Sequence, residues 1–275
     1  MAPSKATSTK APGSDWLYLK LYCGRGVQDD LIAGPLRRLT EASVSRQLAE
    51  QWFFVRYADP EPHVRLRFRG DPRVLTTQLL PELCAWGADL MTEGYCCRFT
   101  FDTYDREVER YGGTLGIETA ERVFHADSVA VVAYKDALAQ RRLPLALEDL
   151  VVLTVDNLLA GLGLSEDARL SWLDATVTWR REVGPDFRRR HALLRSLLHE
   201  ARGEHGRPEL DPLRAALGAA REHLRRVVGP HLPAIHGSLV HMHCNRLVGL
   251  DRSAERRALG MLLRTAESLR HAPVK

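Results

Sequence analysis

A run of alternating basic and apolar residues, HVRLRFR at positions 63–69, is the segment best suited to chemistry in this chain. Successive side chains of a β-strand point to opposite faces of a sheet, so a strand here would place all four basic side chains on one face. These are His63, Arg65, Arg67 and Arg69. Cations at this spacing repel one another, which predicts an anionic partner opposite them. That partner could be a structural carboxylate or an anionic substrate.

A second polar cluster, HGSLVHMHCNRL, occupies residues 236–247. On a helix, His241 and Asn245 share one face, whereas His243 lies about 200° away around the axis at roughly 100° per residue. This period keeps the two histidines from converging on one ion, so no metal site is expected. The small and polar neighbours of His241 favour a wet pocket, although a histidine on a helix is often a satisfied buried side chain.

A third cluster, YDREVERYGG, occupies residues 104–113. If it forms a helical turn, Arg106 and Arg110 lie on one face at i,i+4, and Glu107 can partly neutralise either of them. The alternative is a solvated charged turn that ends at the glycine pair.

The elements that position these clusters follow from hydrophobic periodicity. Strands are expected at 16–23, 52–57, 64–68 and 95–101, and helices at 29–50 and 75–91. This β-α-β-β-α-β order is typical of the ferredoxin-like, split βαβ fold. From residue 116 onward the spacing is helical only, with helices expected at 120–138, 147–159, 164–187, 213–227, 235–250 and 258–269. The predicted class is therefore α+β, with a flexible tail at 1–15, a ferredoxin-like half at 16–115 and a helical half packed on it at 116–275.

Composition restricts the class of protein. With 275 residues, 45% hydrophobic and 27% charged, the chain is expected to fold as a soluble globular protein. The net charge of +4 is mild and carried mainly by arginine, which favours bidentate recognition of defined anions over diffuse binding of nucleic acid. The five cysteines show no CxxC pair, and neither a secretory signal nor a long apolar run is visible, so a reduced cytoplasmic protein is expected.

Four motifs together resemble a known family: WFFVRYADP at 52–60, HVRLRF at 63–68, YDREVERYGG at 104–113 and HMHCNRL at 241–247. They are similar to the thiopeptide-type bacteriocin biosynthesis domain, which also forms the C-terminal elimination half of class I lantibiotic dehydratases. The resemblance implies one of two reactions. One eliminates glutamate from glutamylated Ser or Thr to give dehydroalanine or dehydrobutyrine, and the other joins two dehydroalanines by [4+2] cycloaddition into a pyridine with release of the leader peptide.

The resemblance also implies roles for individual residues. Elimination members carry two arginines on the basic strand, which match Arg65 and Arg67 here. They carry another arginine after the fourth strand, matching Arg106 with Arg110 as a competing alignment, and a late histidine, matching His241. The retained His-x-Arg-x-Arg pattern favours elimination over cycloaddition. The expected catalytic residues are His241, Arg65, Arg67 and Arg106, and the expected substrate-binding residues are His63, Arg110 and Asn245.

This elimination needs a base and charge stabilisation, and no cofactor is expected. A fixed donor that stabilises the developing enolate contributes roughly 3 to 4 kcal/mol. The expected partners are a glutamylated precursor peptide and a separate tRNA-dependent glutamylation protein that complements this stand-alone form. A homodimer is left open, and no membrane and no direct nucleic acid are expected. Two other classes stay open: a nucleic-acid-binding module that uses the arginines for phosphates, and a catalytically silent peptide-binding scaffold.

Overall fold

The computed structural model describes residues 8–203, 206–211, 214, 217 and 232–271. The chain divides into two compact units, Met1–Arg142 and Leu143–Lys275. The division falls after Arg142, whereas the change to purely helical spacing predicted a boundary near residue 115. The difference arises because helix α6 (Thr114–Ala139), which was expected in the helical half, packs on strand β3 (Gln51–Ala58) of the first unit.

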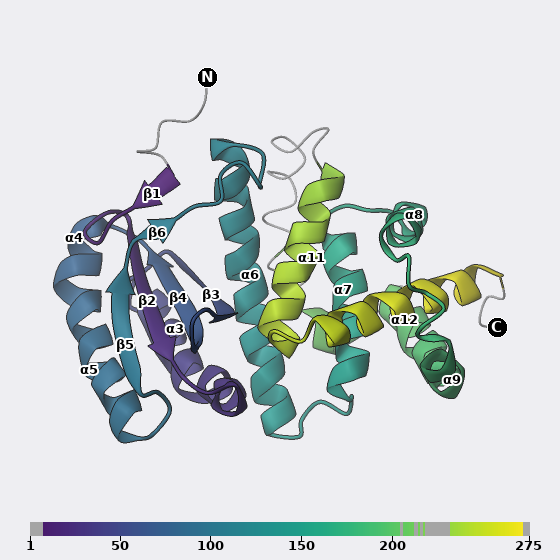
Figure 1. Cartoon of the computed structure of the whole chain (residues 1–275), viewed down its shortest axis with the longest axis horizontal. Coiled ribbons are helices and arrows are strands. Elements are labelled where there is room, and N and C mark those ends of the chain that lie inside the picture. Colours follow the sequence, from purple (N-terminus) through teal and green to yellow (C-terminus); the bar gives the residue numbers. More distant parts are fainter. Residues whose placement is uncertain (1–7, 204–205, 212–213, 215–216, 218–231, 272–275) are drawn as a thin grey trace. The chain divides into compact units, whose positions relative to one another are not determined.

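The first unit is built on a four-stranded antiparallel sheet in the order β3-β4-β2-β5 (Figure 1). Its other strands are β2 (Trp16–Tyr22), β4 (Pro62–Arg69) and β5 (Arg98–Asp102). The central strands are β2 and β4, the first and third of this sheet along the chain. The edge strands are β3 and β5, the second and fourth. This order is the split βαβ arrangement. The predicted α+β class is confirmed.

Helical segments connect these strands. The first connection contains η1 (Arg25–Val27), α2 (Gln28–Leu31), η2 (Ile32–Leu36) and α3 (Arg37–Ser45), and the second contains α4 (Pro72–Val74), η3 (Leu75–Leu79) and α5 (Leu80–Thr92). Helix α5 lies so close to the apolar face of the sheet that a Cβ at Gly87 would come within 2.7 Å of the Phe99 ring. The opposite face carries the basic residues of β4.

The predicted flexible tail at 1–15 is partly wrong. Strand β1 (Thr9–Lys10) pairs with β6 (Tyr104–Asp105), and the amide of Arg106 donates to the carbonyl of Ser8 at 2.7 Å. These backbone hydrogen bonds order the segment, a long-range pairing that its polar composition does not reveal. Residues 1–7 of the predicted tail lie outside the described residues.

The described residues of the second unit form helices and connecting turns, with no strand among them. Its helices are α7 (Leu147–Gly161), α8 (Glu166–Thr176), α9 (Gly184–Arg202), the short η4 (Pro208–Leu210), α11 (Leu232–Val248) and α12 (Arg252–His271). Helix α7 packs against α9, α11 and α12, and is buried along nearly its whole length. The single helix expected at 164–187 is two helices, because the backbone at Val177 leaves the helical region. The helix expected at 213–227 falls, apart from isolated residues, outside the described part.

No helix within the described ranges has both the length and the apolar composition to cross a membrane.

Candidate functional site

Arg67 lies among aromatic rings on the basic face of the sheet. Its guanidinium carbon is 4.3 Å from the ring centre of Tyr18, 4.4 Å from that of Tyr104 and 5.3 Å from that of Phe53. The residue is only 7% exposed, and burial lowers its pKa from the ordinary arginine value. Its Nε has no hydrogen-bond partner, and no carboxylate of the described residues pairs with the guanidinium. Arg67 is therefore a buried cation stabilised by ring faces.

Arg65 lies one rung along the same face and is half-buried. Its guanidinium carbon stacks 3.5 Å from the ring centre of Tyr57, and its Nε donates to Nε2 of His63 at 3.0 Å. Within the described part of the chain, no carboxylate pairs with it. Arg69, at the end of the row, differs because its Nε lies 3.8 Å from the carboxylate of Asp15. Of the two partners that the sequence left open, Arg69 has the structural carboxylate, while Arg65 and Arg67 have none.

The neighbouring charges on this face are paired among themselves. Lys20, opposite Arg65 on β2, forms an ion pair with Asp102, and Arg98 donates to Glu61 at 3.1 Å. Lys20 and Arg98 thus have carboxylate partners, whereas Arg65 and Arg67 have none among the described residues.

Arg106 is held in a buried ion pair with Glu121 of α6. Its Nε and Nη2 donate to the two carboxylate oxygens at 2.8 Å and 2.6 Å, and the Tyr104 hydroxyl donates to the same carboxylate at 2.9 Å. The Glu121 side chain is fully buried. Arg106, which the sequence predicted to act on substrate, thus has a structural partner. The ion pair links the segment directly after β6 to α6.

Arg110 lies apart from Arg106. The segment after β6 is a turn and not a helix, so the two arginines do not share a helical face. Arg110 is exposed and lies 3.0 Å from Glu107, consistent with the alternative of a solvated charged turn.

In the second unit, His241 of α11 contacts Glu255 near the start of α12. Nδ1 of the imidazole lies 2.8 Å from the Glu255 carboxylate and 2.9 Å from Nη1 of the exposed Arg252. Glu255 can only accept from Nδ1 and Arg252 can only donate to it, so the two contacts call for opposite tautomers. In the tautomer with the proton on Nδ1, the ring donates to Glu255, and Nε2 has its lone pair available. This is the arrangement required of a general base oriented by a carboxylate.

The two polar neighbours of His241 on α11 are buried. Nε2 of His243 lies 2.8 Å from the Thr154 hydroxyl, so it is a satisfied buried histidine. Asn245, one turn after His241, is 3% exposed, and its burial gives no direct support for the expected contact with substrate. Within the described ranges, no cluster of three or more His, Cys, Asp or Glu side chains could hold a metal.

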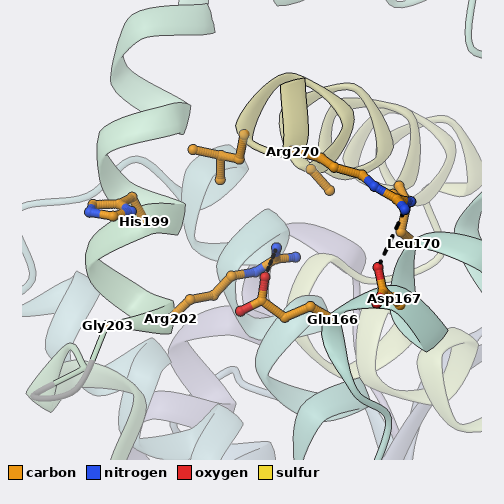
Figure 2. Close-up of a pocket in the computed structure, with 9 residues that line it drawn as sticks. Glu166, Asp167, Leu170, His199, Arg202, Gly203 and Arg270 are labelled. Atoms are coloured by element: carbon orange, nitrogen blue, oxygen red, sulfur yellow. Dashed lines mark hydrogen bonds and ion pairs between the residues drawn. The ribbon is translucent and has the colours of Figure 1, made fainter. Parts of the chain in front are cut away.

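A hollow of about 300 Å³ in the second unit contains none of the predicted residues. Its charges already neutralise one another: Figure 2 shows Arg202 beside Glu166 and Arg270 beside Asp167, at 3.3 Å and 3.8 Å. Arg202 also pairs with Asp156. This hollow therefore offers no uncompensated charge to an ionic substrate. The candidate groups are the arginines of β4 and the histidine of α11.

Comparison with known proteins identifies the family. The model of the lantibiotic biosynthesis dehydratase C-terminal family matches residues 16–266. The chain belongs to this family. The match spans both compact units, which confirms the resemblance that the four motifs indicated.

The curated relatives are much longer proteins. The subtilin biosynthesis protein SpaB of Bacillus subtilis is 29% identical over 262 residues, which cover 91% of this chain and 25% of SpaB. The nisin biosynthesis protein NisB of Lactococcus lactis subsp. lactis is 26% identical over 257 residues, covering 90% of this chain and 25% of NisB. The chain thus spans about a quarter of the length of these relatives.

Two solved structures share the fold. The tRNA-dependent lantibiotic dehydratase MibB from Microbispora sp. 107891 aligns with a TM-score of 0.82 and 29% identity, over 95% of this chain and 29% of MibB. TbtD, a pyridine synthase from thiomuracin biosynthesis, aligns with a TM-score of 0.72 over 93% of this chain and 99% of its own. Its identity is 15%, so this likeness concerns the fold alone.

Three residues that position the candidate groups were missed by the sequence analysis: Tyr57, Glu121 and Glu255. Tyr57 and Glu255 had a usable signal, because one ends the aromatic strand before the basic hairpin and the other follows His241 at the start of the next helix. Glu121 had no such signal, since it resembles any other charged residue of an amphipathic helix.

Proposed function

We propose that this protein eliminates glutamate from O-glutamyl serine or threonine in a ribosomally made precursor peptide, leaving dehydroalanine or dehydrobutyrine. The observation that carries the proposal is the pair Arg65 and Arg67, which have no carboxylate partner among the described residues. Three other buried arginines do have one: Arg56 pairs with Asp29, Arg106 with Glu121 and Arg169 with Asp156. Two uncompensated guanidinium groups on one sheet face suit a substrate that carries a carboxylate and develops further negative charge.

The reaction requires a base and a means of stabilising that charge. Removal of the α-proton leaves an electron pair that forms the Cα–Cβ double bond, and the Cβ–O bond breaks to release glutamate with its new carboxylate. Arg65 and Arg67 stabilise the enolate oxygen and the departing carboxylate through charge-assisted hydrogen bonds. His241 takes the α-proton on Nε2, while the Glu255 carboxylate accepts a hydrogen bond from Nδ1–H and stabilises the imidazolium. No step in this scheme calls for a redox or metal cofactor.

The substrate must come from a glutamyl-transfer reaction on the same precursor peptide. The proposal assigns that reaction to a tRNA-dependent glutamylation protein, which would hand the glutamylated peptide to this one. Membership of the dehydratase family supports a peptide substrate over a nucleic acid.

Two incubations test the proposal, one with glutamylated precursor peptide and one with a peptide that contains dehydroalanines, each followed by mass spectrometry. Loss of glutamic acid from the first peptide is expected. Release of a leader fragment and formation of a macrocycle from the second peptide would instead establish cycloaddition. Unchanged masses of both peptides would indicate a peptide-binding scaffold without catalytic activity. Arg69→Lys is the matched control for Arg65→Lys, because Arg69 lies on the same row but has a carboxylate partner.

A further inference from the structure

His63 fills a closed position at the start of the basic row. Its residue surface is 0% exposed, and its ring lies between those of Tyr22 and Tyr57, with centroid distances of 5.0 Å and 5.5 Å. Both ring nitrogens are engaged within the protein: Nδ1 lies 2.8 Å from the carbonyl oxygen of Glu61, and Nε2 lies 3.0 Å from Nε of Arg65. No nitrogen is left for a ligand, in contrast with the substrate-binding role expected from the sequence.

These contacts define the tautomer of His63. The Nε–H of Arg65 can only donate, so Nε2 of the imidazole must accept. The proton of a neutral ring is then on Nδ1, where it donates to the Glu61 carbonyl. A second proton would remove the acceptor and place a positive charge directly beside Arg65.

The same contacts define what remains free on Arg65. Its Nε is bound by His63 and one face of its guanidinium lies on Tyr57, so the two terminal amino groups point along a fixed axis. Terminal amino groups held in this way suit the two oxygens of a carboxylate, because the fork geometry is set before the ligand arrives.

We infer that His63 is a positioning residue, which as a neutral Nδ1–H imidazole aligns the Arg65 fork for a substrate carboxylate and releases that alignment when it is protonated. This inference rests on the proposed function for the identity of the carboxylate, but the alignment itself can be measured without turnover.

The groups around His63 keep it neutral at ordinary pH. Burial lowers its pKa below the usual 6.5, the Glu61 carbonyl opposes this shift, and the charges of Arg65 and Lys20 lower the pKa further. Asp59 acts in the opposite direction. On β5, Arg98 stacks 4.0 Å from the Tyr22 ring centre, and its charge is paired with the Glu61 carboxylate.

Nuclear magnetic resonance of the full chain labelled with ¹⁵N tests the alignment directly. We expect His63 in the Nδ1–H form and an Arg65 Nε–H signal that exchanges slowly at neutral pH and disappears on acidification, with a midpoint below pH 6.5. In His63→Phe, which keeps a ring between the two tyrosines, this signal should exchange fast at every pH. An Nε2–H tautomer, or an Arg65 signal unchanged in His63→Phe, would overturn the inference.

Elimination assays then connect alignment to activity. His63→Phe should lower kcat/KM for the glutamylated peptide about tenfold, the usual effect of one lost hydrogen bond. His63→Gln, which retains an uncharged acceptor for Arg65, should recover most of the rate. A wild-type rate in His63→Phe would also refute the inference. If wild-type protein eliminates nothing, the proposed function fails, while the resonance measurement still decides the role of His63.

Discussion

At the scale of single residues, two arginines on one strand are held in different ways. Arg67 is enclosed by aromatic rings and makes no ion pair with a described residue. Arg65 is fixed at its Nε by His63, and its terminal amino groups have no partner in the part of the chain that the structure describes. Arg65 is therefore suited to bind an incoming carboxylate. Arg67 supplies a desolvated positive charge, whose interaction with a developing enolate is stronger than in water.

Replacing either arginine with lysine should remove most activity. Arg65→Lys and Arg67→Lys retain the charge but lose the planar fork, and we expect kcat/KM to fall about 100-fold. Arg69→Lys should stay within about threefold of wild type. Near wild-type rates in both test variants, with an unchanged unfolding temperature, would exclude these arginines from the mechanism.

The histidine of α11 should behave as a base oriented by its carboxylate partner. His241→Ala should lower kcat for elimination about 10²- to 10⁴-fold, and Glu255→Gln about tenfold, because the amide no longer stabilises the imidazolium. Arg257→Ala, an exposed change on the same helix as Glu255, serves as the control. Equal activity in Glu255→Gln and wild type would show that this contact does not assist catalysis.

Two tyrosines beside Arg67 should differ in their effect on stability. The Tyr18 hydroxyl is buried without a hydrogen-bond partner, while the Tyr104 hydroxyl donates to Glu121. Tyr18→Phe should leave the free energy of unfolding unchanged or raise it by up to about 1 kcal/mol, and Tyr104→Phe should lower it by about 1 to 2 kcal/mol. Urea unfolding of the two variants measures both changes, and the reverse order would contradict these assignments.

At the scale of elements, the ion pair between Arg106 and Glu121 joins the segment after β6 to α6. Both side chains are nearly or fully buried, with 5% and 0% of their surfaces exposed. This contact adds to the packing of α6 on β3, because it ties the helix to the segment that follows the small β1-β6 sheet of the first unit.

Removing one partner of this pair should destabilise the first unit strongly. Arg106→Met and Glu121→Gln should each lower the free energy of unfolding by about 3 to 5 kcal/mol, because each leaves a buried polar or charged group without its partner. The double variant should lose less than the sum of the two single losses. If Arg106→Met is as stable as wild type but inactive, Arg106 acts on substrate and its pairing with Glu121 is not its main role.

At the scale of the whole molecule, three histidines, two of them buried and one half-buried, make stability depend on pH. Burial lowers the pKa of His63, His125 and His236 below that of the unfolded chain. A lowered pKa means that the folded protein binds fewer protons than the unfolded chain between the two values. The contribution of these neutral histidines to the free energy of unfolding is complete above pH 6.5. It is lost as the pH falls through their lowered pKa values.

The midpoint temperature of thermal unfolding should therefore be lower at about pH 5.5 than at about pH 7.5. His63→Gln should reduce this difference, because it removes one of the three titrating groups. An unfolding midpoint that does not change between the two pH values would contradict the assignment of neutral buried histidines.

The α+β class, the four strands of the sheet and the helical character of the C-terminal part follow from the sequence, because the periods of strands and helices are local properties of the chain. The alternation in β4 also predicts which face carries the arginines. Which arginines are paired becomes clear only in the folded chain, since this depends on side chains from other elements: Asp15 beside Arg69, Glu121 beside Arg106, and rings beside Arg65 and Arg67. The tertiary structure likewise pairs β1 with β6 and brings Glu255 to His241. These contacts join residues distant in the sequence through single side chains, and no local period records them.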